Sequence, residues 1–379
     1  MKDHSLEVHG CHTYDATGAI SPSICLSATF RHPRFGESTG YDYGRVANPT
    51  RESLEKTVAL LERGGRSWAL SSGMAAVQLV FSLLSAGDHV LMSEDLYGGT
   101  VRLAEEVFAD YGITFEYVDV RDLALVGKRM RPETKLVFIE TPSNPMMQIA
   151  DIAALSALAH ENGALLAVDN TFLSPHFQKP LTLGADIVLH SGTKYLCGHN
   201  DVIAGFLVLK DATSAQAKRI ELLAKSAGPN LSALDSWLML RSIKTLGVRV
   251  ERQAENALAI ARWLGTLPEV TEVLYPGLAD HPGYALQQKQ ASGAGGMISF
   301  KVRSAELAKA ALGRLHLIAF AESLGGVETL LTYPIAQTHA EMPAALLKRT
   351  GLDDKLLRLS VGIEDVEDLK ADLQQALQG

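Results

Sequence analysis

Residues 165–171 read Leu-Leu-Ala-Val-Asp-Asn-Thr, and residues 187–194 read Ile-Val-Leu-His-Ser-Gly-Thr-Lys. Each stretch is a short apolar run followed by a polar turn, which is typical of a buried strand in a parallel sheet. Similar runs predict five further strands, at residues 67–70, 89–92, 114–118, 135–139 and 203–208. Amphipathic stretches between them predict helices at 75–84, 98–111 and 152–161. This alternation predicts an α/β domain with a mostly parallel seven-stranded sheet.

The pattern changes on both sides of this domain, which we place at residues 51–240. Residues 1–50 show little periodicity and contain several glycines and prolines, so we expect an N-terminal arm that packs on a neighbouring subunit. A single long helix over 232–267 is expected to lead into a smaller α+β domain, residues 241–379. Its strands are predicted at 270–274, 296–302 and 356–360.

The composition is that of an ordinary globular protein. Of the 379 residues, 47% are hydrophobic and 21% are charged, which argues against a disordered chain. Asp and Glu number 43 and Lys and Arg 35, for a net charge of −8. Because nucleic-acid-binding proteins normally present a basic face, we expect no nucleic-acid partner.

Cysteine content and hydropathy predict a cytoplasmic protein. The chain has three cysteines, Cys11, Cys25 and Cys197. Three are too few for a disulfide framework, and an odd number cannot all pair within one chain. The first ten residues have no apolar core of the kind a signal peptide needs. The uncharged stretch 67–87 contains five serines, which favours a buried strand and helix over a membrane span. We therefore expect no membrane partner.

Two other kinds of site are disfavoured by missing partners. His9, Cys11 and His12 are metal-ligand types, but no Cys-x-x-Cys pair accompanies them, so we expect no metal ion. Ser191 and Lys194 match the Ser-x-x-Lys of serine acyl enzymes. The Ser-Asp-Asn and Lys-Thr-Gly motifs that such a hydrolase also needs are absent.

Four strand-end loops carry the preferred candidate site. They are residues 71–74, 141–145, 169–171 and 191–194. In open α/β sheets, ligands bind beyond the carboxyl ends of the strands, where these loops meet. The N–H groups of Gly73 and Met74 at a helix start, with the hydroxyls of Ser191 and Thr193, suit a phosphate.

Asp169 and Lys194 extend this phosphate site to a specific cofactor. A carboxylate at the end of a buried strand is costly unless it meets a cation, and a protonated pyridine nitrogen is such a cation. The amine of Lys194 follows an apolar strand, where partial desolvation makes it reactive. A Schiff-base lysine with an aspartate on the pyridinium nitrogen is the arrangement of pyridoxal 5′-phosphate (PLP) enzymes.

Longer motifs then show a family resemblance that covers nearly the whole chain. They include Tyr-Asp-Tyr-Gly-Arg-Val-Ala-Asn-Pro-Thr at 41–50, Glu-Thr-Pro-Ser-Asn-Pro at 140–145, His-Ser-Gly-Thr-Lys-Tyr at 190–195 and Arg-Leu-Ser-Val-Gly-Ile-Glu-Asp at 358–365. The sequence resembles the Cys/Met-metabolism PLP enzymes of fold type I, such as cystathionine γ-synthase, γ-lyase and β-lyase. This resemblance implies a PLP cofactor, amino-acid substrates and a homo-oligomer, expected to be a tetramer, with active sites built between two subunits.

The resemblance also implies roles for individual residues. Lys194 would form the Schiff base and move protons, Asp169 would hold the pyridine nitrogen, and Tyr97 would stack on the ring and act as a base. The phosphate would be held by Gly73, Met74, Ser191 and Thr193, together with Tyr43 and Arg45 of the neighbouring subunit. Arg358 would bind the substrate carboxylate. The other expected substrate contacts are Asn144, Ser323, Glu322, Asp42 and, as a weaker candidate, Arg102.

The reaction type is harder to predict than the cofactor. Asp42 and Glu322 are acidic where γ-synthases often are, and two carboxylates would bind the distal ammonium of cysteine or cystathionine. This favours γ-replacement, in which an O-acyl-homoserine and cysteine give cystathionine. Cystathionine γ-lyase is the main alternative, followed by β-lyase and O-acylhomoserine sulfhydrylase; Gly99 counts against methionine γ-lyase. A non-catalytic binding protein would be expected to lack Lys194 or Asp169, and both are present.

Overall fold

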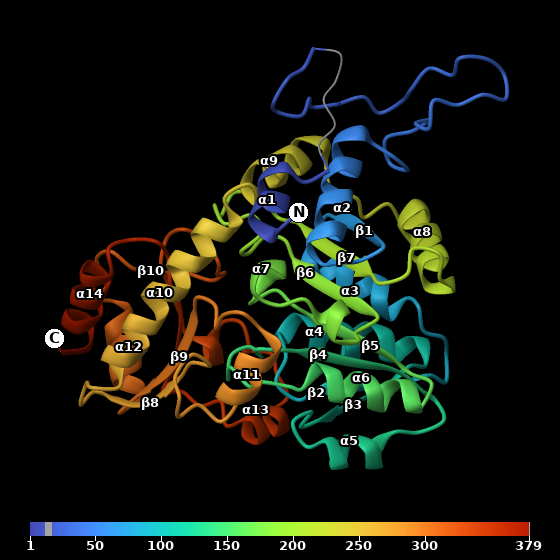
Figure 1. The fold of residues 1–379 in the computed structure, drawn as a ribbon. Helices are drawn as coiled ribbons and strands as arrows, with labels where there is room; N and C mark the ends of the chain where they lie inside the picture. Colours follow the sequence, from blue (N-terminus) through green and yellow to red (C-terminus); the bar gives the residue numbers. More distant parts are fainter. Residues whose placement is uncertain (12–16, 379) are drawn as a thin grey trace.

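The structure is a computed structural model that describes residues 1–11 and 17–378 (Figure 1). Its larger sheet has seven strands, as predicted, and each predicted strand ends within two residues of the observed one. Neighbouring strands β6, β5, β4, β2 and β3 are parallel, and β7 is antiparallel to both β1 and β6. The strand order is β1 (Arg66–Leu70), β7 (Gly205–Leu209), β6 (Ile187–Ser191), β5 (Leu165–Asp169), β4 (Thr134–Glu140), β2 (His89–Ser93) and β3 (Thr114–Val118).

Helices cover both faces of this sheet, which explains why its strands are apolar throughout. Val137 and Ile139 of β4 point into the core under α2 (Pro49–Leu61) and α6 (Ile152–Glu161). Leu136 and Phe138 point into the opposite core, under α3 (Gly73–Phe81) and α8 (Ala215–Ala227). The helix predicted at 98–111 begins as α4 (Gly98–Leu103) and continues through a π-helical turn and a 3₁₀ turn to Tyr111. A short helix, α5 (Leu123–Arg129), precedes β4.

The prediction of a single long helix over 232–267 is wrong, because the chain forms two helices there. They are α9 (Ala233–Ile243) and α10 (Leu246–Leu264). At the break, the guanidinium of Arg249 donates hydrogen bonds to the carbonyl oxygens of Ser242 (3.1 Å) and Tyr195 (2.8 Å). The helical periodicity of the sequence continues across the break, and the contact with Tyr195, 54 positions away, is one that no local pattern shows.

A second sheet of five strands forms the core of the C-terminal region (Figure 1). Its order is β10 (Ala319–Phe320), β11 (Leu330–Thr332), β12 (Leu356–Ser360), β9 (Met297–Val302) and β8 (Val270–Leu274). The three longer strands were predicted; β10 and β11 are too short to show a periodicity. The sheet packs against α10, α12 (Ala305–Leu312) and α14 (Val366–Gln378). Further helices are α7 (Ser174–Phe177), α11 (Tyr284–Gln290) and α13 (Ala344–Thr350).

The N-terminal region is only partly an extended arm. Residues 3–9 form a helix, α1 (Asp3–His9), which contacts α2 and α10 and was not predicted. The chain from Thr17 to Ala47 is irregular and projects away from the rest of the molecule (Figure 1). Its apolar side chains Ile20, Leu26 and Phe35 are exposed. The boundaries at residues 50 and 240 remain predictions.

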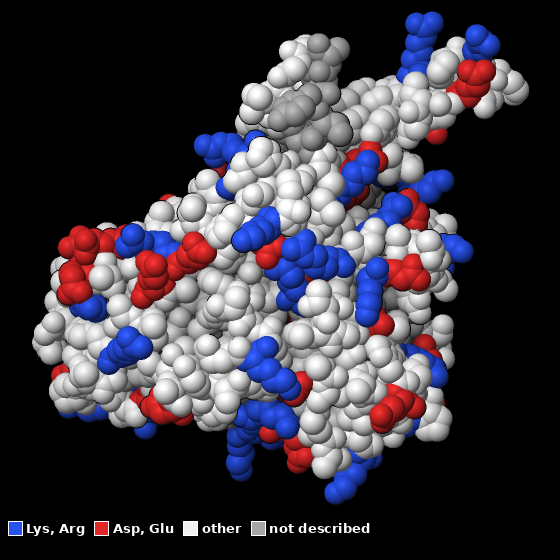
Figure 2. All heavy atoms as spheres, viewed as in Figure 1, with Lys and Arg blue, Asp and Glu red and all other residues white. Residues whose placement is uncertain are grey.

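On the face drawn in Figure 2, basic and acidic side chains are interspersed, and no continuous basic band crosses it. Among the described residues, none of the helices combines the length and the apolar character that a bilayer crossing requires.

Candidate active site

A cavity of about 270 Å³ opens at the carboxyl ends of β4, β5 and β6. These strands are parallel, so the loops that follow them converge on one edge of the sheet, as predicted. The loop between β10 and β11 closes the cavity from the second sheet. Most of the predicted site residues line it: Gly73, Met74, Tyr97, Asn144, Asp169, Ser191, Thr193, Lys194, Glu322, Ser323 and Arg358.

The start of α3 forms one wall of the cavity. The hydroxyl of Ser72 caps the helix by accepting a bond from the Ala75 N–H (3.1 Å), and among the described residues the N–H groups of Gly73 and Met74 have no acceptor. A Cβ on Gly73 would lie 2.9 Å from the Cβ of Ser191. Because residue 73 is a glycine, the backbone amides at the start of α3 can lie close to Ser191 and Thr193, whose hydroxyls line the same cavity.

Lys194 lies near the centre of the site. Its Nζ donates to the hydroxyl of Ser323 (2.7 Å). Burial, reinforced by the Arg358 cation, lowers the pKa of the Lys194 amine to about 8. About a tenth of this amine is therefore neutral at pH 7, far more than for an ordinary lysine, and the neutral form is the one that a nucleophile or a base requires. Ser323 has a positive φ of 88°, so the backbone at this contact is held in an uncommon conformation.

Asp169 lines the cavity beside the buried carboxyl group of Glu140. Its Oδ1 accepts bonds from the backbone N–H (3.0 Å) and the hydroxyl of Thr171, and this hydroxyl accepts one from the Ser191 N–H (2.8 Å). Glu140 is its partner in the register of β4 and β5. Burial and the charge of Asp169 raise the pKa of Glu140, and burial raises the pKa of Asp169. A cation in the cavity would relieve both effects.

Arg358 is a buried cation whose partners are neutral. Its side chain is 2% exposed, and its two terminal nitrogens donate to Asn144 Oδ1 (2.6 Å) and, at 3.3 Å each, to the Ser323 carbonyl and the Thr332 hydroxyl. Its Nε has no partner among the described residues. Burial lowers the pKa of the guanidinium to about 10. Because a buried charge without a counter-ion is costly, this guanidinium is ready to accept a carboxylate.

Tyr97 and Glu322 lie where the cavity meets solvent. The Tyr97 ring is 41% exposed, and its backbone N–H donates to Glu140 Oε1 (3.2 Å). A Cβ on Gly99 would lie 2.5 Å from this ring, so a side chain at that position would displace it. Glu322 is exposed and precedes Ser323 directly.

Four predicted site residues are not brought to the cavity of their own chain. Arg45 donates to the carbonyl of Lys225 and lies over the ring of Tyr43 (5.6 Å), and Asp42 accepts a bond from Ser38 (2.5 Å), all in the projecting segment or at its base. Arg102 forms an exposed ion pair with Glu341. The roles of Tyr43, Arg45 and Asp42 require a neighbouring subunit and stay predictions.

Sequence reasoning missed several cavity residues. Glu140 is the last residue of β4, and Thr171 lies two residues after the end of β5. Both strands were predicted, so a polar residue at or just beyond a strand end could have been included in the predicted site. Thr338 comes from a loop of the C-terminal region without periodicity, and nothing in the sequence marks it. The additional lining residues include Ser72, Thr100, Glu140, Thr171, Phe172 and Thr338.

The residues present fit PLP. Unpaired helix N-terminal amides and nearby hydroxyls suit its phosphate, and the two carboxyl groups that line the cavity, one of them hydrogen-bonded by Thr171, suit a protonated ring nitrogen. The amine of Lys194, whose pKa is lowered, would be available to its aldehyde. These groups and Tyr97, which could stack on the cofactor ring, line one cavity.

Comparison with known proteins agrees with this site. The family described as Cys/Met metabolism PLP-dependent enzyme matches residues 4–378. Cystathionine gamma-lyase of Bacillus subtilis (strain 168) is 47% identical over 379 residues, all of both chains. Cystathionine beta-lyase MetC of the same organism is 47% identical over 365 residues, 96% of this chain and 93% of its own.

A solved structure agrees with both. Cystathionine gamma synthase from Xanthomonas oryzae pv. oryzae, in complex with aminoacrylate and cysteine, superposes with a TM-score of 0.95 at 41% identity, over 100% of this chain and 98% of that one. The three proteins carry out different reactions, so the similarity identifies a group of enzymes and not one activity. This chain therefore belongs to the Cys/Met metabolism PLP-dependent enzymes of fold type I, and it is a transsulfuration enzyme of the cystathionine γ-synthase, γ-lyase and β-lyase group.

Proposed function

We propose that this enzyme catalyses γ-replacement, in which an O-acyl-L-homoserine and L-cysteine give L-cystathionine and a carboxylate. The observation that carries the proposal is the pair of opposite charges on one cavity: Arg358 at its base and Glu322 at its mouth. This pair suits an amino-acid ligand with a carboxylate at one end and an ammonium at the other, as cysteine presents once its sulfur is bonded to the homoserine chain. The X. oryzae γ-synthase was solved with cysteine, which agrees with this choice.

The side chains of the cavity would have different roles in this reaction. PLP, when bound, supplies an electron sink for carbanions formed on the substrate. Arg358 binds and orients the α-carboxylate through charged hydrogen bonds. Lys194 Nζ takes and returns protons within the cavity, and Ser323, its hydrogen-bond partner at 2.7 Å, holds it in place. Tyr97 shields the site from water on its exposed side and offers a second group for proton transfer.

A second candidate is γ-elimination from cystathionine. It is the reaction named for the B. subtilis γ-lyase, which is 47% identical over its full length; the equally identical MetC of the same organism keeps β-elimination as a third candidate. γ-Replacement and γ-elimination use the same carbon and the same distal ammonium, so Glu322 supports both. We also propose that Tyr43, Arg45 and Asp42 complete the site of a neighbouring subunit in a homo-oligomer.

Product analysis separates these reactions. The purified holoenzyme is given O-succinylhomoserine or O-acetylhomoserine with cysteine, and separately cystathionine alone. We expect cystathionine as the main product of the first assay, with the higher kcat/KM. A higher kcat/KM for cystathionine, with 2-oxobutyrate and cysteine as products, would instead establish γ-lyase. Pyruvate and homocysteine would establish β-lyase, and either result would reject the proposal.

A further inference from the structure

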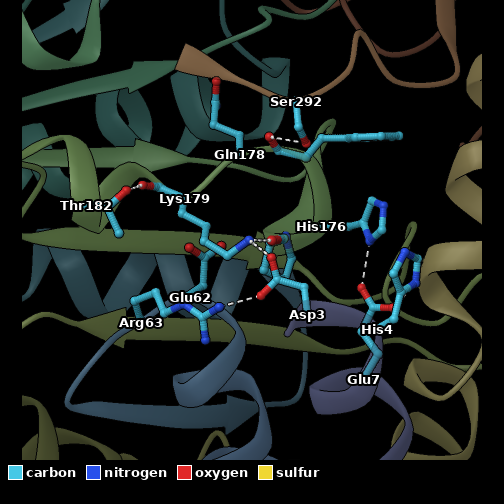
Figure 3. A network of polar contacts seen from close by, with 12 residues as sticks. Asp3, His4, Glu7, Glu62, Arg63, His176, Gln178, Lys179, Thr182 and Ser292 are labelled. Atoms are coloured by element: carbon cyan, nitrogen blue, oxygen red, sulfur yellow. Dashed lines mark hydrogen bonds and ion pairs between the residues drawn. The ribbon is translucent and has the colours of Figure 1, made fainter. Parts of the chain in front are cut away.

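A second cluster of reactive side chains lies outside the cavity, where α1 meets α7 and α10. One ligand atom from each of His4, Glu7 and His176 lies within 4.8 Å of the other two, and this is the one group of three or more metal-ligand side chains among residues 1–11 and 17–378 (Figure 3). None of the three lines the active-site cavity. The cluster differs from the His9, Cys11 and His12 group weighed in the sequence, of which His12 lies outside the described residues.

The carboxylate of Glu7 is the centre of the cluster and is well buried, with 3% of its side chain exposed. Glu7 Oε1 lies 2.7 Å from His176 Nδ1, and Glu7 Oε2 lies 3.6 Å from His4 Nδ1. His4 and Glu7 are three residues apart on α1, which places them on one face of the helix. Figure 3 shows both imidazole rings turned toward this carboxylate.

A second carboxylate lies on the far side of both rings. Glu251 Oε1 is 3.3 Å from His4 Nε2 and 3.5 Å from His176 Nε2. Each imidazole therefore has Glu7 on its Nδ1 side and Glu251 on its Nε2 side. Metal-binding histidines almost always show this arrangement, because the ring N–H that does not bind the ion donates to a carboxylate or carbonyl.

Gly247 leaves the space that the cluster occupies. A Cβ at this position in α10 would lie 2.6 Å from Glu7 Oε2 and 2.7 Å from His4 Nδ1. The Gly247 N–H donates to Glu7 Oε2 (3.2 Å). Gly247 is the second residue of α10, so its N–H has no acceptor within the helix; Glu7 supplies that acceptor, and the absence of a side chain leaves room for His4.

We propose that His4, Glu7 and His176 bind a divalent transition-metal ion, zinc being the best fit, with Glu251 as the carboxylate that orients both rings. Two imidazoles and one carboxylate with an open fourth position are an established zinc ligand set. With zinc–ligand bonds of about 2.0–2.1 Å, the ligand atoms of a tetrahedral site lie about 3.4 Å apart. The 3.6 Å between His4 Nδ1 and Glu7 Oε2 is close to this spacing. His176 Nδ1 and Glu7 Oε1 are at hydrogen-bond distance (2.7 Å), so these two atoms would move apart when an ion replaces the proton between them, and the exposed His4 can rotate toward the ion.

The ion would join α1 to the body of the protein. His4 and Glu7 belong to α1, whereas His176 belongs to α7 and Glu251 to α10. Nearby, Asp3 also pairs with Arg63 and, at 2.9 Å, with Lys179, so two sets of polar contacts hold the same short helix (Figure 3). The segment that α1 anchors leads into the projecting arm, so the site would be structural and would stabilise the start of that arm.

Cobalt and zinc binding to the holoenzyme test this proposal. The protein is freed of metal with a chelator and titrated with Co²⁺, whose visible ligand-field bands report a tetrahedral site, and Zn²⁺ is then added as a competitor. We expect one Co²⁺ per subunit, displaced by Zn²⁺. His176→Ala and His4→Ala should each weaken binding by more than tenfold, and Glu251→Gln by about 10- to 100-fold. Hydrogen exchange at residues 3–9 should slow when Zn²⁺ is added to the wild type.

The control is His160→Ala, because His160 pairs with the carboxylate of Asp186 at 2.8 Å on another part of the surface. It should bind Co²⁺ like the wild type. His4 is exposed, so His4→Ala is expected to fold even if His176→Ala does not. The proposal is overturned if the wild type binds no ion, if His4→Ala binds it unchanged, or if Zn²⁺ leaves the exchange of residues 3–9 unaltered.

Discussion

The lowered pKa of Lys194 is the residue-scale property with the most direct consequence. Because its amine has a pKa of about 8, the neutral, nucleophilic form becomes dominant as the pH rises through that value. We expect the rate at which cofactor-free enzyme captures PLP to rise with pH and to level off above about pH 9, where nearly all of the amine is neutral. Stopped-flow absorbance against pH measures it.

Lys194→Ala should retain PLP weakly and lose nearly all turnover. In the wild type, borohydride should attach the cofactor to the peptide that contains Lys194. Attachment to another lysine would show that a different amine performs this role.

Asp169→Asn should keep the fold and lose most of the activity. The substitution preserves the shape of the side chain that Thr171 holds, but it removes the negative charge. Losing one partner of a buried charged pair typically costs about 3–5 kcal/mol. Turnover of the PLP-loaded variant is compared with that of the wild type, with circular dichroism as the test of folding. Near-normal turnover would mean that Asp169 does not face the ring nitrogen.

Glu322→Gln should change substrate preference and leave cofactor binding intact. A charged hydrogen bond contributes about 1.5–3 kcal/mol, which corresponds to a loss of roughly ten- to hundredfold in kcat/KM for substrates with a distal ammonium. Elimination from O-acetylhomoserine alone, which has no such group, should change little. Glu328→Gln is the matched control, because Glu328 is exposed on the same loop and binds Asn200 instead (2.8 Å). Equal losses for both substrate types would remove the basis for Glu322 as a specificity residue.

At the scale of elements, the proposed phosphate site at the start of α3 depends on how closely β7 approaches the turn before that helix. A Cβ on Gly205 would lie 1.9 Å from the carbonyl oxygen of Ser72, which only a backbone shift could relieve. Gly205→Ala should therefore displace the turn and weaken PLP binding by at least tenfold, measured by equilibrium dialysis. Gly127→Ala is the control, since a Cβ there would be 3.7 Å from its nearest neighbour, Leu158. Equal affinities would show that the turn adapts without cost.

At the scale of the whole molecule, the projecting arm is difficult to explain in a single chain. Its base is tied down, because Trp237 Nε1 donates to the Pro22 carbonyl (2.9 Å) and Asn48 to that of Cys25 (2.8 Å). Beyond these bonds it exposes Leu26 and Phe35. Apolar side chains of an ordered segment are normally covered, so a second copy of the chain is the expected cover.

Subunit mixing tests whether that second copy shares an active site. Arg45→Ala and Lys194→Ala subunits should each be inactive alone. Mixed dimers should regain part of the activity, because one of their two sites then contains both native residues. Differently tagged subunits allow verified hybrids to be purified and assayed. Inactive hybrids, formed from variants that each fold, would rule out a site shared through Arg45.

The sequence alone determined the seven strands, the polar loops at their ends and the cofactor. These are local signals: an apolar run followed by Asp169 or Lys194 marks a strand end, and parallel strands bring such ends to one edge. Glu140 could have been added on the same grounds, since it ends the strand beside that of Asp169.

Only the tertiary structure decided the remaining features, because they depend on contacts between residues far apart in the chain. Arg358 meets Asn144 across 214 positions, and Glu7 meets His176 across 169, with no local pattern to announce either contact. At the break between α9 and α10, Arg249 donates to the carbonyl of Tyr195, 54 positions away, and β10 and β11 are stabilised by pairing with neighbouring strands, not by their own few residues. Local sequence records which groups end a strand, whereas packing decides which distant groups they meet.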